Sequence, residues 1–139
     1  MLKGDFFAPA IFVKNFASIY KRGSKCMEGQ SSCIMIKKRS IIYKIPLRDI
    51  LYICKNLRLS CVITVSGEQH TFYAKFDEIQ PFLNKSFLQC HKSYIVNLEK
   101  VIALQAAWFW LENGEHLPIS QKRRKKSREY YQNYLRGNL

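Results

Sequence analysis

A succession of short apolar segments, separated by turn-forming residues, constrains the fold of this chain more than any other feature. Five of them fill the first half, at residues 33–37, 41–45, 47–54, 61–65 and 69–74. They are rich in the β-branched and aromatic side chains that favour strands, and Ser66-Gly67 suits a two-residue hairpin link between the last two. Regular short strands at this spacing predict a mainly β, antiparallel body and not alternating βαβ units.

The second half of the chain continues the pattern. Strand-like segments lie at residues 87–90, 94–97, 100–105, 108–112 and 116–119. Asn113-Gly114 between the last two is the strongest hairpin signal in the chain. Pro118 predicts that the last strand lies at a sheet edge, because proline has no N–H to donate to a neighbouring strand. We therefore expect antiparallel short-strand sheets in this half as well.

Three segments have helical periodicity. The central one, residues 76–83, must be short because Pro81 lies inside it. Residues 9–20 have apolar side chains at helical spacing and precede a polar, glycine-containing stretch, so residues 1–32 are expected to be an N-terminal helix and linker. Ser120 is a good N-cap for a C-terminal helix that runs to about Leu135. Residues 33–139 are then predicted to form one domain.

The charges of the chain are unevenly placed. There are 23 basic and 10 acidic side chains, which give a formal net charge of +13. Residues 21–44 carry a surplus of six positive charges and residues 122–128 carry six more, whereas the middle of the chain is nearly balanced. Such clustering is typical of a surface that meets a polyanion. A surface that is only solubilising is the alternative.

Several function classes find no support in the sequence. The five cysteines are odd in number and follow no secretory signal, so free thiols in a reducing cytoplasm are the simplest interpretation. The histidines are scattered without paired ligand spacing, which argues against a metal site. No apolar run approaches the roughly 20 residues that span a bilayer. There is also no phosphate loop or nucleophile motif, so we expect neither an enzyme nor a bound cofactor.

Three polar segments are candidate contact sites. His91, Lys92 and Ser93 lie between two apolar runs, and burying them without partners would cost a few kcal/mol each, so they belong on a surface loop. Residues 121–126 place cations at a helix N-terminus, which opposes the macrodipole by about 0.3–1 kcal/mol each. A bound phosphate would reverse that sign. Residues 55–58 form a polar turn between two strands.

These segments also carry a family resemblance. Residues 87–97, read Phe-Leu-Gln-Cys-His-Lys-Ser-Tyr-Ile-Val-Asn, resemble the central motif of LytTR-type (LytR/AlgR family) DNA-binding domains. Residues 45–53 and 117–122 resemble the family's opening strands and closing segment, so the likeness covers about residues 35–135. The sequence departs from the family at Gln89 and Gln121, where arginine is common. The resemblance implies a mainly β fold that inserts loops into successive major grooves.

Position in the family motif assigns DNA contacts to Lys92, to Lys122 and to a first-hairpin position near Leu59 and Ser60. Together with the polar segments, the predicted DNA-binding residues are Lys55, Asn56, Arg58, Ser60, His91, Lys92, Ser93, Gln121, Lys122, Arg123 and Arg124. The His91 ring has an alternative role with equal weight, which is to bond a neighbouring backbone group. Tyr94 is expected to face the core and Asn97 to satisfy a turn.

The function that explains most features is sequence-specific binding of double-stranded DNA by a bacterial-type transcription regulator. A homodimer, or two copies on repeated half-sites, is the arrangement that we consider for it. The alternative is an RNA-binding or single-stranded nucleic-acid-binding β module, which would require exposed aromatic side chains that stack unpaired bases. A protein-interaction or membrane-surface module would leave the central motif unexplained.

Overall fold

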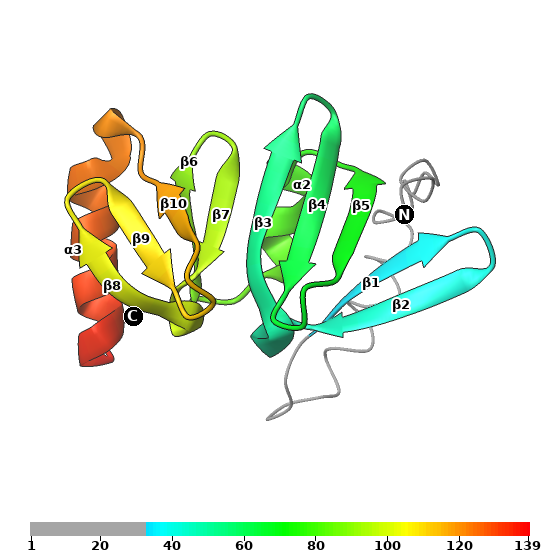
Figure 1. Cartoon of the computed structure of the whole chain (residues 1–139), viewed down its shortest axis with the longest axis horizontal. Helices are drawn as coiled ribbons and strands as arrows, with labels where there is room; N and C mark the ends of the chain where they lie inside the picture. The colour runs from blue at the N-terminus through cyan, green and yellow to red at the C-terminus, as the bar shows by residue number, and fades with distance from the viewer. Residues whose placement is uncertain (1–32) are drawn as a thin grey trace.

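The computed structural model describes residues 33–139. The predicted N-terminal helix and linker, residues 1–32, lie outside the described residues. Within residues 33–139, ten strands form three antiparallel sheets that lie in a row (Figure 1). The predicted mainly β, antiparallel fold is confirmed.

The first two sheets come from the first two thirds of the chain. A separate hairpin consists of β1 (Cys33–Lys38) and β2 (Ile41–Pro46). The five-stranded sheet has the order β5-β4-β3-β7-β6. Its strands are β3 (Ile50–Asn56), β4 (Leu59–Thr64), β5 (Gln69–Tyr73), β6 (Phe87–His91) and β7 (Tyr94–Asn97).

The third sheet has the order β10-β9-β8 and contains β8 (Val101–Gln105), β9 (Trp108–Leu111) and β10 (His116–Pro118). Pro118 therefore lies on an edge strand, as predicted. The turn at Asn113-Gly114 joins β9 to β10, and Gly114 has a φ of 94°. Helix α3 (Arg124–Arg136) packs on this sheet, where the Tyr131 ring meets Phe109 at 5.6 Å between centroids.

Proline limits the central helix as expected. Helix α2 spans only Phe76–Ile79, and the 3-10 turn η3 (Gln80–Phe82) with Pro81 in its first positions follows it. Several boundaries differ from the prediction, and two of the differences change a connection between strands. Residues 47–49, expected in a strand, form the 3-10 turn η2 (Leu47–Asp49). The β4–β5 connection spans residues 65–68 and is longer than the two residues predicted.

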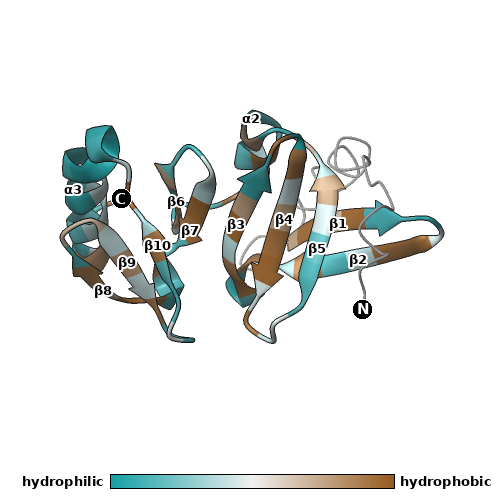
Figure 2. Cartoon of the chain, turned by 45° about the horizontal axis from the view of Figure 1, so that its top comes forward, coloured by the Kyte–Doolittle hydropathy of each residue, from teal (hydrophilic) through white to brown (hydrophobic). Residues whose placement is uncertain are grey.

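Two apolar cores lie under the sheets. One contains Ile36, Ile53, Val62 and Phe72, with α2 closing it. The other lies between the β6–β7 hairpin, the three-stranded sheet and α3; its fully buried members include Cys90, Val96, Phe109 and Leu111. Hydrophobic residues fill the middle of β3 and β4, while hydrophilic residues occupy the end of β3, the β6–β7 connection and the start of α3 (Figure 2).

Asn97 ties the strands together at the end remote from the β6–β7 turn. Its side chain is fully buried. The amide group donates to the carbonyl oxygens of Ile50 at 2.8 Å and Leu47 at 3.4 Å, and the amide oxygen accepts from the Glu99 N–H at 3.1 Å. The predicted turn-satisfying role of Asn97 is therefore found in the structure. These bonds also hold η2 against the end of β7.

Candidate nucleic-acid interface

Three connections lie at the same end of the strands (Figure 1). They are the β3–β4 turn (residues 56–59), the β6–β7 turn (residues 91–94) and the β10–α3 connection (residues 119–124), which we call together the contact edge. The three predicted polar segments thus come from distant parts of the sequence and meet in space.

Backbone hydrogen bonds hold the contact edge together. The Lys55 N–H donates to the Ser93 carbonyl oxygen at 2.9 Å, which joins the first turn to the second. The Ser120 N–H donates to the Cys90 carbonyl oxygen at 2.9 Å, and the Cys90 thiol lies 3.5 Å from the Pro118 carbonyl oxygen. The second turn is thereby joined to the β10–α3 connection. Because these bonds involve backbone groups, they fix the spacing of the turns whatever side chains the turns carry.

Contacts of the His91 ring stabilise the β6–β7 turn. The Ser93 N–H donates to His91 Nδ1 at 3.1 Å, and the His91 ring lies 5.6 Å from the Tyr94 ring. Partial burial, with the charges of Lys92 and Arg123, lowers the pKa of His91. A neutral imidazole that accepts at Nδ1 carries its proton on Nε2. The backbone-bonding role considered for His91 is present, and Nε2–H remains a donor for an external acceptor.

Lys92 occupies the tip of the same turn. Its side chain is exposed and has no carboxylate partner among residues 33–139. An uncompensated ammonium group at a loop tip can reach the acceptor atoms of guanine or a phosphate oxygen.

The β10–α3 connection begins differently from the prediction. Ser120 does not cap a helix: its hydroxyl makes no cap bond, and Oγ is buried without a hydrogen-bond partner among residues 33–139. The 3-10 turn η5 (Gln121–Arg123) intervenes, and α3 begins at Arg124. The backbone position of Ser120 is instead set by its N–H bond to β6.

The cations of this connection nevertheless lie where the sequence placed them. Gln121, Lys122 and Arg124 are exposed and Arg123 is half-buried. The Arg124 Nε donates to the Ile119 carbonyl oxygen at 3.4 Å. The first turn of α3 contains no acidic residue. Positive side chains therefore gather around the start of α3, an arrangement suited to an anion.

The β3–β4 turn presents part of its predicted set. Asn56 pairs with Leu59, so the turn itself is Leu57-Arg58, and Leu57 has a φ of 60°. Asn56 and Arg58 are exposed, whereas Lys55 lies with Nζ 5.2 Å from the Phe76 ring centroid.

Ser60 cannot make the predicted contact. Its side chain is fully buried, and its hydroxyl donates to the Ala74 carbonyl oxygen at 2.8 Å. Strand alternation explains the error, because Ser60 shares the inward face of β4 with Val62 and Thr64.

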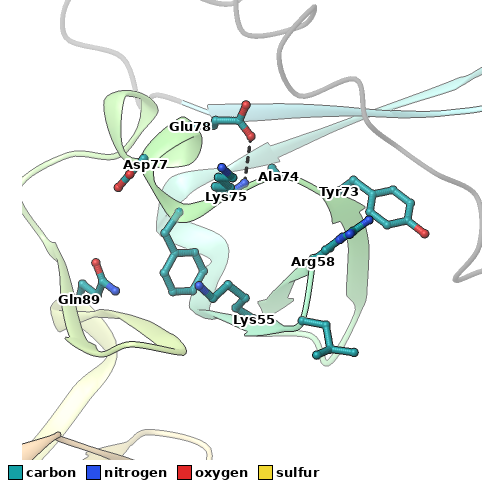
Figure 3. Close-up of a pocket in the computed structure, with 10 residues that line it drawn as sticks. Lys55, Arg58, Tyr73, Ala74, Lys75, Asp77, Glu78 and Gln89 are labelled. Carbon is teal, nitrogen blue, oxygen red and sulfur yellow. Dashed lines mark hydrogen bonds between the residues drawn. The ribbon is translucent and has the colours of Figure 1, made fainter.

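A hollow of about 530 Å³ opens beside the β3–β4 turn (Figure 3). Lys55, Arg58 and Lys75 supply cationic side chains to its lining, and Tyr73 supplies an aromatic one. Lys75 and Tyr73 are not among the DNA-binding residues predicted from the sequence. The signal that could have identified them is their place at and just after the end of β5, the strand that pairs with β4 beside the turn.

Gln89, where the family commonly has arginine, also lines this hollow. Its amide nitrogen donates to the His91 carbonyl oxygen at 3.2 Å, and its amide oxygen accepts from Gln80 Nε2 at 3.4 Å. Gln89 therefore braces the base of the β6–β7 turn without adding a charge.

Other kinds of site are not found in the described part of the chain. No group of three His, Cys, Asp or Glu side chains within residues 33–139 could hold a metal ion. Among the same residues no helix has the length and apolar character needed to cross a bilayer.

Comparison with known proteins identifies the family of this chain. The family model described as the LytTr DNA-binding domain matches residues 40–132, so the class is that of DNA-binding domains. The chain belongs to the LytTR family. A solved LytTr DNA-binding domain from Bacillus cereus superposes with a TM-score of 0.63 at 24% sequence identity, over 73% of this chain and 97% of that one. This likeness confirms the fold. No curated protein matches the chain.

Proposed function

We propose that this protein is a transcription regulator that binds double-stranded DNA sequence-specifically through the contact edge. The observation that carries the proposal is the convergence of three polar turns, joined by backbone hydrogen bonds, at one end of the strands. Loops fixed in this way can enter grooves with a defined spacing, which sequence readout requires. The family membership supplies the DNA partner.

The side chains of the contact edge fall into two groups, those suited to base edges and those suited to phosphates. Lys92 and Arg58 are exposed at turn tips, and the half-buried His91 keeps a donor at Nε2; all three are suited to acceptors on base edges. Lys122, Arg123 and Arg124 surround the start of α3 and are suited to phosphates, which fix register without carrying sequence information. Gln121 is exposed beside them and can donate or accept. Two copies, as a homodimer or on separate half-sites, would read two repeats.

The test is a fluorescence titration of duplex DNA that carries two repeats about 10–10.5 base pairs apart, the spacing of one helical turn. The protein is compared on duplex DNA, single-stranded DNA and RNA of equal length. Duplex affinity should fall by about 10³-fold between 50 and 200 mM salt if roughly six phosphates are contacted.

Three lysine variants sharpen the test. Lys92→Ala should weaken binding by about 1–3 kcal/mol and relax the preference at one base position, because it removes the proposed contact to a base edge. Lys122→Ala should weaken binding evenly across sequences. Lys44→Ala is the matched control, since Lys44 is an exposed cation on β2, away from the contact edge. Equal loss from Lys44→Ala would refute the role of the contact edge. Equal binding of single strands would refute the proposal and favour the RNA alternative.

A further inference from the structure

Two cysteine side chains lie side by side on the five-stranded sheet. Cys54 of β3 is the direct partner of Cys61 of β4 in the strand register. Both are half-buried and free, and the two thiols interact with each other. Their side chains share the face opposite to the buried Ile53, because successive residues of a strand point to opposite sides.

The backbone around this pair sets the separation that a cross-link would have to span. The Lys55 N–H points away from β4, since it donates to the Ser93 carbonyl oxygen. The neighbouring Cys54 therefore directs its backbone groups toward β4 and forms a hydrogen-bonded pair with Cys61. The Cα atoms of such a pair are about 5.5 Å apart, which lies within the usual range for a disulfide. The Cβ atoms, also about 5.5 Å apart, would have to approach by about 1 Å, so the disulfide would be strained and readily reduced.

The chemical environment distinguishes the two sulfurs. Interaction with the Cys54 thiol, together with the Thr71 hydroxyl 3.6 Å away and the charge of Lys38, lowers the pKa of Cys61. The same pair interaction, with burial, raises the pKa of Cys54. By contrast, burial raises the pKa of Cys90 to about 12, and this thiol is fully enclosed in the core. Cys61 is therefore the more reactive sulfur of the pair, and Cys54 is placed to resolve its oxidised form.

We propose that Cys54 and Cys61 form a redox-sensitive dithiol that a hydroperoxide converts reversibly into an intrachain disulfide. The Cys61 thiolate attacks one peroxide oxygen, the O–O bond breaks, and the other oxygen leaves as water or an alcohol after protonation. Cys61 is then a sulfenic acid. The Cys54 sulfur attacks the Cys61 sulfur, the S–OH bond breaks, water leaves and the S–S bond forms. The two sulfurs together lose two electrons, which reduce the peroxide. An external thiol restores both cysteines by exchange.

The pair adjoins the first turn of the contact edge. Cys54 and Cys61 are each two residues from the pair that closes this turn, Asn56 and Leu59. Cys54 also pairs with Tyr94 of β7, whose ring contacts His91. The disulfide would thus clamp the hairpin that carries Arg58. The inference itself rests on thiol geometry and does not depend on DNA binding.

Peptide mass spectrometry of the full chain tests the proposal. The reduced protein is treated with hydrogen peroxide, remaining thiols are alkylated, and the chain is digested with trypsin. Lys55 and Arg58 lie between the two cysteines, so cleavage separates them and a disulfide appears as two linked peptides. We expect the Cys54–Cys61 link as the main product, reversed by dithiothreitol, with Cys90 still alkylated.

Variants and unfolding complete the test. Cys54→Ser and Cys61→Ser should each abolish the link, and Cys54→Ser should leave a sulfenic acid at Cys61 that dimedone traps. Cys26→Ser, which removes a competing thiol, should leave the link unchanged. In guanidinium chloride the link should form more slowly, because the fold holds the sulfurs together. Cross-links mainly to Cys26 or between chains, or equal rates in folded and unfolded protein, would overturn the proposal.

Discussion

Replacing Asn97 by alanine should destabilise the protein strongly without altering how the folded molecule binds DNA. Asn97 is fully buried and makes two good hydrogen bonds, to the Ile50 carbonyl oxygen and from the Glu99 N–H. The third, to the Leu47 carbonyl oxygen at 3.4 Å, is weak. Alanine would leave these backbone groups without their side-chain partners. Each buried group so orphaned costs about 1–3 kcal/mol.

The Ile50 carbonyl is enclosed in the core, whereas the Glu99 N–H bond is only part-buried, in the 3-10 turn η4 (Leu98–Lys100), so losing it should cost less. We therefore expect a loss of about 2–4 kcal/mol, a large part of the 5–15 kcal/mol that stabilises a typical domain. Asn97 ends β7 at the side remote from the contact edge, so the affinity of the folded fraction for DNA should not change.

Urea denaturation followed by tryptophan fluorescence measures this loss, with the free energy of unfolding extrapolated linearly to water. Asn113→Ala is the matched control. Asn113 makes similar bonds, from the Glu115 N–H at 3.0 Å and to the Glu115 carboxylate at 2.9 Å, but in an exposed turn. Water replaces both partners there, so the loss should stay below about 1 kcal/mol. Equal losses for the two variants would refute the argument that burial sets the magnitude.

Three further predictions follow from single contacts. Ser60→Ala should lower the free energy of unfolding by about 1–3 kcal/mol, because the Ala74 carbonyl oxygen loses its donor; unchanged stability would contradict the buried bond. Gly114→Ala should lower it by about 1 kcal/mol in urea denaturation, since alanine is strained at a φ of 94°, and a neutral result would argue against that conformation. Burial lowers the pKa of both His70 and His91, so the unfolded chain takes up these protons first and stability should fall as the pH drops below about 6.5. Nuclear magnetic resonance titration should place both histidine midpoints below that value. Midpoints above it would mean that stability rises, and does not fall, as the pH drops.

Strand content could be read from the sequence because each strand has its own local pattern. Tyr94–Asn97 was bounded correctly, and proline limited the central helix as expected. The boundary at residues 47–49 depends instead on a contact between distant residues. Leu47 is buried and accepts a bond from Asn97, fifty positions away, and no local pattern shows that contact.

The candidate site shows the same division between local and distant causes. Polar turns such as His91-Lys92-Ser93 were found because an interrupted apolar run is a local signal. The predicted DNA contact of Ser60 is wrong because it rests on position in the family motif, whereas strand alternation turns this side chain inward. The hollow lined by Lys75 could not be foreseen, because it forms only where β5 pairs with β4 and the residues after β5 come near the β3–β4 turn.

The start of α3 is the place where local helix preference and the fold disagree most. Lys122, Arg123 and Arg124 approach the positive end of the helix dipole, and no acidic residue in the first turn compensates them. The far part of the helix holds the segment in place, since Tyr131 is buried against Phe109. Packing therefore maintains an arrangement that isolated helix electrostatics disfavour. A phosphate at this end would turn each repulsion into an attraction, so the unfavourable placement makes physical sense for a surface that meets an anion.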